Sequence, residues 1–328
     1  MNATGAVPSG SGVRAGPRAL RVTFLGNDPW SVPPLEALAA SRHRPQLVVT
    51  RVPRPAGRGS RLTPTAVAGA ARRLDLHLAE VETVKSGSGF ERLAGSSPDI
   101  MVVVAYGEIL PAAALSMPAV APVNLHFSLL PQLRGASPVQ GALLAGLERT
   151  GVTTMVMDEG LDTGPVLLQR DEPIEPEDDA GSLGERLARI GGGLLVQTLD
   201  GLAAGDLESR PQEGEPTFAP RLKAEDRWLD WGESAEALAG RVRALSPEPA
   251  ASTRFRDEIL KVFRAEPLPG PASGDDPGTV VAVDGEGVTV GTGSGRLRLL
   301  EVGPAGRRRM SAAEFARGHR PVPGEGMG

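Results

Sequence analysis

Residues 122–137 read PVNLHFSLLPQLRGAS, an apolar run that ends in a polar turn, and residues 158–165 read DEGLDTGP. The apolar part, residues 123–128, predicts a strand. Asn124 and His126 lie two positions apart on it, so both side chains project from the same face. A buried strand rarely carries an amide and an imidazole side by side without partners. The stretch therefore indicates a strand of an α/β sheet that carries a polar site.

Outward from this stretch, strand-like and helix-like segments alternate along the chain. Strands are expected at residues 20–26, 46–50, 100–105, 123–128 and 153–157, and helices at residues 33–40, 63–74, 138–147 and 182–202. The run IMVVVA at residues 100–105 has no polar alternation, which suits a parallel sheet covered on both faces. Residues 51–62 read as a loop. Ser182 and Glu185 stand at capping-box spacing at the start of the long helix. The alternation predicts an α/β domain over residues 20–205.

The character of the sequence changes after this domain. Residues 206–220 are polar and contain three prolines, which favours an interdomain linker. A helix is expected at residues 234–245, followed by short strands at residues 253–255, 258–263, 278–283, 287–290 and 296–302. Ser311 and Glu314 predict a last helix that Gly318 could end. Residues 221–325 therefore predict a small all-β barrel, and residues 1–19 read as a disordered tail.

Composition limits the classes of function. The chain has 328 residues, more than one hydrophobic core usually serves, so two domains are expected. It has no cysteine, which excludes disulfides, thiolate metal sites and cysteine nucleophiles and fits a reducing cytoplasm. Four scattered histidines predict no metal site, and the lack of an apolar run of 18 residues predicts no membrane helix. The net charge of −5 means that any nucleic acid must meet a local basic patch.

The first strand ends in Gly26-Asn27-Asp28-Pro29. This turn lacks the second and third glycines of G-x-G-x-x-G, and no G-x-x-x-x-G-K-[ST] occurs. Dehydrogenase and P-loop NTPase activities therefore lose their main support. Asn27 and Asp28 suit a turn and a helix cap, and contact with a substrate is the open alternative.

Asn124, His126 and Asp162 have side chains that suit acyl transfer to an amine. An asparagine amide can donate to a developing oxyanion, and histidine can donate to the same oxygen or move a proton. An aspartate can orient the imidazole or accept the proton that the amine must lose. Because catalytic residues gather at the carboxyl ends of strands, we expect the three to converge there. The alternative is a capped, hydrogen-bonded strand end with no catalytic role.

The stretches at residues 123–146 and 151–167 closely resemble the folate-dependent formyltransferases, whose signature is Asn-x-His-x-Ser-Leu-Leu-Pro with a downstream Leu-Asp-Thr-Gly. The resemblance covers about residues 20–325. It implies a Rossmann-like formyltransferase domain followed by an OB-like barrel. It also implies transfer of the formyl group of 10-formyltetrahydrofolate to the α-amine of methionyl initiator tRNA, without a metal. This acceptor is favoured by four further stretches of resemblance, at residues 54–62, 98–111, 219–231 and 304–315. We expect a cytoplasmic monomer.

The resemblance assigns the site residues. Asn124, His126 and Asp162 match the family's catalytic residues. The folate-binding positions are implied to be Ser128, Leu129, Leu130 and Pro131, together with Val102, Val103, Val104, Ala105 and Tyr106. The last five are less specific, because an ordinary core strand has the same composition.

Two arginine clusters predict a tRNA surface. Residues 51–61 hold four arginines and no acid, and residues 296–309 hold five arginines and one acid. Arginine can fork to phosphates or stack on bases. The resemblance implies tRNA contacts at Arg54, Arg58 and Arg61, and the barrel patch adds Arg307, Arg308 and Arg309. In each case a solvated basic surface is the alternative.

Three stretches depart from the family pattern: the first turn, Val52-Pro53 before the arginine loop, and Ser246-Pro247-Glu248-Pro249. None includes Asn124, His126 or Asp162. Two other functions stay open. One is formyl transfer to a small-molecule amine, such as a nucleotide sugar or a purine-pathway amine, and the other is an inactive tRNA-binding module.

Overall fold

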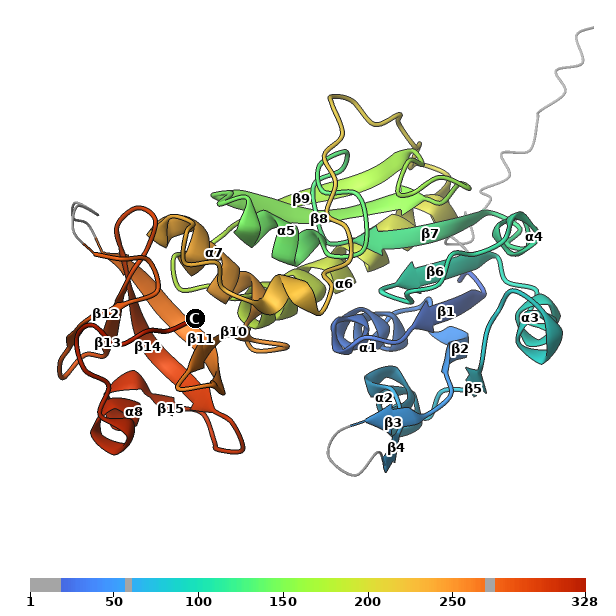
Figure 1. Cartoon of the computed structure of the whole chain (residues 1–328). Helices are drawn as coiled ribbons and strands as arrows, with labels where there is room; N and C mark the ends of the chain where they lie inside the picture. The colour runs from blue at the N-terminus through green and yellow to red at the C-terminus, as the bar shows by residue number, and fades with distance from the viewer. Residues whose placement is uncertain (1–18, 57–60, 269–274) are drawn as a thin grey trace, which may run out of the picture.

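The computed structural model describes residues 19–56, 61–268 and 275–328. Two large β-sheets organise these residues, with helices packed against both, and a two-stranded hairpin forms a third, small sheet (Figure 1). The proposed tail, apart from its last residue, and Arg58 lie outside the described residues. No helix in the described part of the chain is long and apolar enough to cross a membrane.

The first sheet has seven strands in the order β5-β2-β1-β6-β7-β8-β9. Their bounds are β1 Val22–Gly26, β2 Pro45–Arg51, β5 Leu78–Val81, β6 Ile100–Val104, β7 Ala121–His126, β8 Arg149–Val156 and β9 Val166–Pro173. The pairs from β5 to β7 are parallel, as the apolar runs indicated, but β8 and β9 pair antiparallel. The sequence pattern predicted neither β5 nor β9.

Helices cover both faces of this sheet. Their bounds are η1 Pro29–Ser31, α1 Val32–Ala40, α2 Ala66–Arg73, α3 Gly87–Gly95, α4 Ala112–Leu115, α5 Pro138–Leu144 and α6 Ala180–Ala204. One core joins the sheet to α1, α2, α5 and α6, and a second core joins it to α3 and α4. Alternate residues of β6 divide between them, because Val102 packs in the first core and Val103 in the second. The sequence pattern predicted neither α3 nor α4.

The long helix begins earlier than its predicted capping box. Asp179 is the N-cap, and its Oδ1 accepts from the backbone N of Ser182 at 2.9 Å. The Ser182 hydroxyl in turn accepts from the Asp179 backbone N at 3.0 Å. The predicted capping box of Ser182 and Glu185 was therefore wrong, because the observed capping box lies three residues earlier, at Asp179 and Ser182. Both aspartate and serine cap helices well, so the sequence alone did not separate the two positions.

The expected loop at residues 51–62 contains a small antiparallel hairpin. Its strands are β3 Arg54–Ala56 and β4 Arg61–Thr63, and Pro55 pairs with Leu62. The described part of the arginine-rich segment is therefore a paired ribbon that follows the end of β2.

The second sheet is antiparallel and belongs to the C-terminal part of the chain. Its strands are β10 Ala251–Phe255, β11 Glu258–Leu268, β12 Val280–Val283, β13 Val288–Gly291, β14 Arg296–Pro304 and β15 Met310–Ser311. It shares a core with α7 Ala235–Leu245 and α8 Ala312–His319. The short helix η2 spans Glu225–Arg227. Helix α8 ends at His319 with Arg320 in the left-handed region at φ 49°, so Gly318 is not its terminator.

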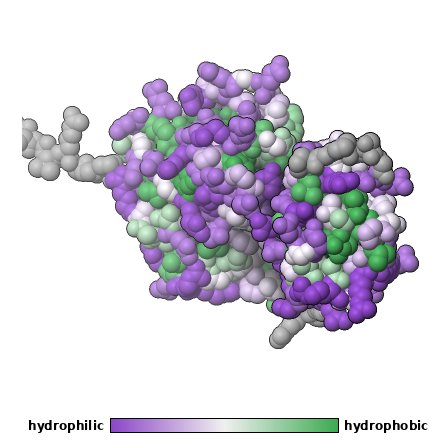
Figure 2. All heavy atoms as spheres, turned by 90° about the vertical axis from the view of Figure 1, so that its left-hand side faces the viewer, coloured by the Kyte–Doolittle hydropathy of each residue, from purple (hydrophilic) through white to green (hydrophobic). Residues whose placement is uncertain are grey.

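The two sheets meet through helices and a few polar contacts. Helix α7 packs on α5, where a Cβ on Gly240 would lie 3.2 Å from the carbonyl oxygen of Leu143. Arg264 on β11 pairs with Glu177 ahead of α6 at 2.8 Å. The Gly181 backbone N donates to the Ser246 carbonyl at 3.2 Å. Figure 2 shows a largely hydrophilic surface with smaller apolar patches on the face that it presents.

Candidate active site

His126 and Asp162 come together although they are far apart in the sequence. Nδ1 of His126 lies 3.8 Å from Oδ2 of Asp162, and both side chains are largely buried. Nε2 of His126 lies 3.0 Å from the carbonyl oxygen of Leu133. A carbonyl can only accept, so Nε2 carries the proton of that hydrogen bond. The bond fixes the ring and leaves Nδ1 facing Asp162.

Asn124 stands on the same face of β7 as His126. Its neighbours Val123 and Leu125 pack in the core on the other face, as the two-residue period of a strand requires. The Asn124 side chain is half-buried and makes no hydrogen bond within the described residues. Polar groups this close to a core are usually paired. An amide left open beside a fixed imidazole is therefore a donor that is available to a ligand.

Asp162 reaches the site by a route that the sequence did not suggest. Because β8 is antiparallel to β7, its carboxyl end pairs Val156 with Val123, near the start of β7. The convergence at carboxyl strand ends was therefore the wrong reason for placing Asp162 here. Instead, residues 157–165 fold back toward His126. Asp162 lies in the left-handed region at φ 51°, and its Oδ2 accepts from the Gly135 backbone N at 2.8 Å.

The base of this loop is tightly braced. Asp158 Oδ1 accepts from the Gly160 backbone N at 3.0 Å and from the Thr163 hydroxyl at 2.7 Å. A Cβ on Gly164 would lie 1.8 Å from the carbonyl oxygen of Val156. Only glycine fits at that contact, so the Leu-Asp-Thr-Gly sequence has a steric reason.

The segment Ser128–Pro131, implied to bind folate, is held by the neighbouring strands. The Thr153 hydroxyl donates to the Ser128 carbonyl at 2.6 Å, and Gln169 Nε2 donates to the Leu130 carbonyl at 2.8 Å. The Ser128 hydroxyl donates to the Gln132 carbonyl at 2.5 Å. Ser128 and Leu130 are buried, while Leu129 and Pro131 are half-buried. The segment is thus a fixed wall of the site, and its contact with folate stays a prediction.

Residues 102–106, also implied to bind folate, lie mostly inside the cores. Val102, Val103, Val104 and Tyr106 are buried, whereas Ala105 is exposed with φ 42°. Burial raises the pKa of the Tyr106 hydroxyl well above its ordinary value. The four buried side chains serve packing, as expected of an ordinary core strand. What remains for a ligand is the exposed backbone turn at the end of β6.

Asn27 and Asp28 form the turn and the helix cap that the sequence suggested. Asn27 Oδ1 accepts from the Thr50 hydroxyl at 2.9 Å and from the Arg51 backbone N at 2.8 Å, and its Nδ2 donates to the Tyr106 carbonyl. It therefore ties together the ends of β1, β2 and β6. Asp28 caps η1 by accepting from the Trp30 backbone N at 2.9 Å.

The predicted tRNA arginines differ in their freedom to bind phosphate. Arg54 is exposed and makes no side-chain hydrogen bond or ion pair within the described residues. Arg308 pairs with Glu314 at 3.0 Å, and Arg309 pairs with Glu301. Arg307 has no such partner in the part of the chain that the structure describes. Only the backbone of Arg61 is described, in β4. The barrel patch is therefore less basic than its sequence suggested.

One residue that holds the site was not identified from the sequence. Gln212, in the segment expected as a linker, donates from Nε2 to the carbonyls of Asp162 and Gly164, both at 2.8 Å. No sequence pattern links it to a residue 50 positions away.

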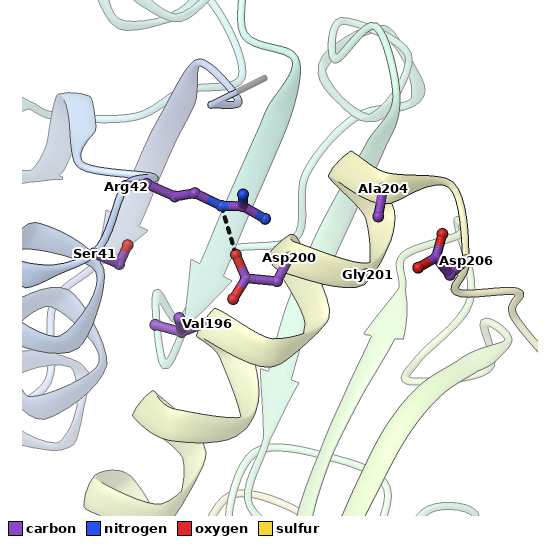
Figure 3. Close-up of a pocket in the computed structure, with 7 residues that line it drawn as sticks. All are labelled: Ser41, Arg42, Val196, Asp200, Gly201, Ala204 and Asp206. Carbon is purple, nitrogen blue, oxygen red and sulfur yellow. Dashed lines mark hydrogen bonds and ion pairs between the residues drawn. The ribbon is translucent and has the colours of Figure 1, made fainter. Parts of the chain in front are cut away.

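A separate hollow of about 710 Å³ lies away from this site (Figure 3). It is lined by Ser41, Arg42, Val196, Asp200, Gly201, Ala204 and Asp206, with Arg42 donating to Asp200 at 2.7 Å. Ser41 follows α1 and precedes β2, so this hollow lies at the amino-end edge of the parallel strands. His126 lies at the opposite edge, at the end of β7.

Comparison with known proteins agrees with the fold. Residues 20–199 match the formyl transferase family, and residues 221–320 match the formyl transferase C-terminal domain. The chain therefore belongs to the formyltransferase family. A solved structure of HypX from Aquifex aeolicus in complex with tetrahydrofolic acid superposes with a TM-score of 0.60 at 18% identity, covering 91% of this chain and 47% of that one. At that identity the likeness concerns the fold alone.

Curated relatives narrow the match within this family. The methionyl-tRNA formyltransferase of Halorhodospira halophila is 46% identical, over 94% of this chain and 99% of that protein. The methionyl-tRNA formyltransferase of Thermus thermophilus is also 46% identical, with the same coverage of 94% and 99%. Within the family, the chain groups with the methionyl-tRNA formyltransferases.

Proposed function

We propose that the chain transfers the formyl group of 10-formyltetrahydrofolate to the α-amine of methionyl initiator tRNA. The observation that carries this function is the open Asn124 amide beside His126, whose Nδ1 lies 3.8 Å from the Asp162 carboxylate. Relatives that match the chain over nearly its full length are methionyl-tRNA formyltransferases, which supports this acceptor over a small-molecule amine.

Asn124 and His126 supply the electrostatic part of the reaction. When the amine adds to the formyl carbon, the formyl oxygen gains negative charge, and the Asn124 Nδ2 donates to it. Nε2 of His126 stays hydrogen-bonded to the Leu133 carbonyl, so the ring supplies a second donor through Nδ1 in its doubly protonated form, whose positive charge the Asp162 carboxylate at 3.8 Å balances. Fixed donors aimed at developing charge need little reorganisation during the reaction, which is why they lower its barrier.

Asp162 supplies the proton-transfer part. The attacking amine must lose a proton as its bond to the formyl carbon forms, and N10 of the folate must gain one as its bond to that carbon breaks. The Asp162 carboxylate accepts the first proton, directly or through a water, and the same proton passes on to N10 as the bond to the formyl carbon breaks, so that the two transfers balance. The hydrogen bond from the Gly135 backbone N holds one carboxylate oxygen toward His126, and the other oxygen is left for this transfer.

The folate is proposed to lie between the Ser128–Pro131 wall and the exposed backbone turn after β6. The tRNA acceptor end is proposed to approach over the β3–β4 hairpin, where Arg54 is exposed without a partner among the described residues. Arg58, which the sequence places between the two strands, is proposed to add a second contact. Contacts to phosphate would fix the register of the tRNA without reading its sequence.

A formylation assay on the purified chain tests this function. The acceptors would be methionyl initiator tRNA, methionyl elongator tRNA, free methionine and a nucleotide-linked amino sugar, with N-formyl product measured by mass spectrometry. Product on initiator tRNA is the expected result. Product on the amino sugar alone would show that the chain formylates a small-molecule amine. No product despite folate binding would indicate an inactive tRNA-binding module.

A further inference from the structure

The segment that joins the two sheets, residues 205–220, packs on the loops of the candidate site; we refer to it as the connector. Its Arg210 exchanges two backbone hydrogen bonds with Val166, at 2.7 and 2.8 Å. Further on, the Arg134 backbone N donates to the Thr217 carbonyl and the Ala219 backbone N donates to the Arg134 carbonyl, both at 2.8 Å. The connector is thus anchored at β9 and again at the loop that contains Leu133.

Gln212 lies between these two anchors and contacts both catalytic loops. Its Nε2 donates to the carbonyl oxygens of Asp162 and Gly164, each at 2.8 Å. Its Oε1 accepts from Nη2 of Arg134 at 2.7 Å and from Nε of Arg134 at 3.2 Å. Carbonyl oxygens only accept and a guanidinium only donates, so the amide can satisfy all of these partners in one orientation only.

The partners of Gln212 explain why this amide matters. Asp162 holds a left-handed backbone at φ 51°, a conformation that a non-glycine residue adopts only when its surroundings impose it. Arg134 follows Leu133, whose carbonyl oxygen accepts the hydrogen bond from Nε2 of His126. One side chain therefore bridges the loop that carries the aspartate and the loop that fixes the histidine.

We propose that Gln212 is a positioning residue that sets the distance between Asp162 and His126 from within the connector. The inference rests on the proposed function, because it gives these two side chains their roles. Gln212 itself does not contact the reacting atoms. Its effect comes through the Asp162 backbone, and a displacement of about 1 Å at a catalytic group can cost on the order of a hundredfold in rate.

The first test compares Gln212→Ala with Glu213→Ala. Glu213 is the adjacent connector residue, and it is exposed without a side-chain partner in the described ranges. Gln212→Ala should lower kcat about 10- to 100-fold, with the KM for 10-formyltetrahydrofolate changed by less than about threefold. Glu213→Ala should keep wild-type kinetics. Equal loss in both variants, or loss in KM alone, would overturn the positioning role.

A second variant separates the two ends of the amide. Gln212→Glu keeps an acceptor for Arg134 but replaces the donor to Asp162 and Gly164 with an oxygen that repels their carbonyls. It should lose as much kcat as Gln212→Ala. Wild-type kcat in Gln212→Glu would show that the Arg134 contact alone matters, and the proposal would fail.

Two further measurements keep the inference distinct from the proposed function. In an Asp162→Asn background, Gln212→Ala should cause little additional loss, because its effect acts through Asp162. Full additivity would contradict the proposal. Hydrogen exchange of peptides covering residues 158–164 should be faster in Gln212→Ala than in Glu213→Ala. Unchanged exchange would overturn the positioning role even in a protein that formylates no tRNA, whereas an inactive wild type contradicts only the proposed function.

Discussion

Nδ1 of His126 lies 3.8 Å from the carboxylate of Asp162, while the other ring nitrogen is bonded to a backbone carbonyl. The imidazole therefore cannot rotate freely to meet either a substrate or its partner. Its one available nitrogen faces Asp162, and the open amide of Asn124 projects from the same face of β7. This fixed orientation is the reason to expect large effects from small changes in these three side chains.

Loss of any of the three proposed catalytic groups should reduce turnover strongly. Asn124→Ala, His126→Ala and Asp162→Asn should each lower kcat about a hundredfold or more, the scale for oxyanion donors and acid–base groups. The measurement is the steady-state rate with methionyl initiator tRNA, with the thermal midpoint as a check on folding. A folded variant with near wild-type turnover would remove that residue from the mechanism.

Two glycine-to-alanine changes should have opposite outcomes. Gly164→Ala would place a Cβ 1.8 Å from the Val156 carbonyl oxygen, so the Asp162 loop must shift and kcat should fall at least about tenfold. Gly193→Ala lies in α6, where the new methyl meets no atom within 4 Å beyond its chain neighbours and its own helix backbone, and it should stabilise the fold by about 0.5–1 kcal/mol. Urea unfolding and the formylation rate check both. Wild-type activity in Gly164→Ala would mean that the loop is looser than its contacts indicate.

Stability should depend on pH through His43. This ring is fully buried; its Nδ1 accepts from the Leu20 backbone N at 3.1 Å, and its Nε2 lies 3.1 Å from Asp200 Oδ1. Burial lowers the pKa of His43 below its ordinary value of 6.5, against an opposing effect of Asp200 and with a smaller lowering by Arg42. The unfolded chain therefore binds the proton more readily than the folded chain. The contribution of His43 to the free energy of unfolding is fully present above about pH 6.5 and is lost as the pH falls below it.

The measurement for His43 is the urea midpoint between about pH 7.5 and 5.5, a range that brackets the ordinary pKa of histidine. Wild type should lose stability over this range, and His43→Gln should lose less of it because no titrating ring remains at this position. His77→Gln provides a control at a second histidine of the same domain. Equal pH dependence in wild type and His43→Gln would exclude His43 as the source.

Neighbouring arginines of the C-terminal sheet should contribute unequally to tRNA binding. Arg307→Ala should raise the KM for methionyl-tRNA and reduce the salt slope of binding by about one, as expected for one lost phosphate contact. Arg308→Ala should do much less, because Glu314 already pairs with its guanidinium at 3.0 Å. Equal effects would indicate that the ion pair opens when tRNA binds, and no effect from either would remove this patch from the tRNA surface.

The sequence predicted local structure well where a run of residues had a single simple pattern. The apolar run of β6 and the two-residue spacing of Asn124 and His126 both predicted local structure correctly. The direction of β8 and β9 was not readable, because side chains alternate between the two faces in parallel and antiparallel strands alike. The antiparallel pairing of β8 and β9 was therefore not predicted, nor was the fold-back of the Asp162 loop. Four of the eight residues of β9 are polar, and only Val166 and Leu167 are buried, so it lacked the signal of a buried strand.

The support around the site was less predictable than its catalytic side chains. Leu133 and Gly135 act through backbone atoms, which no side-chain pattern reports. Gln212 acts through a contact 50 residues away in sequence. Arg308 and Arg309 were expected to be available to tRNA, because a count of arginines in a segment does not show which acidic side chains they pair with in the fold.

The connector also determines where this protein can be recombined with its relatives. A chimaera joined near residue 205 would exchange the anchors at Arg210, Thr217 and Ala219 together with the C-terminal sheet, so the donor connector would have to match the recipient's loops. A junction just after residue 220 would keep those anchors with the loops that they hold. Exchangeable modules in this architecture therefore begin after the connector, although the first sheet ends before it.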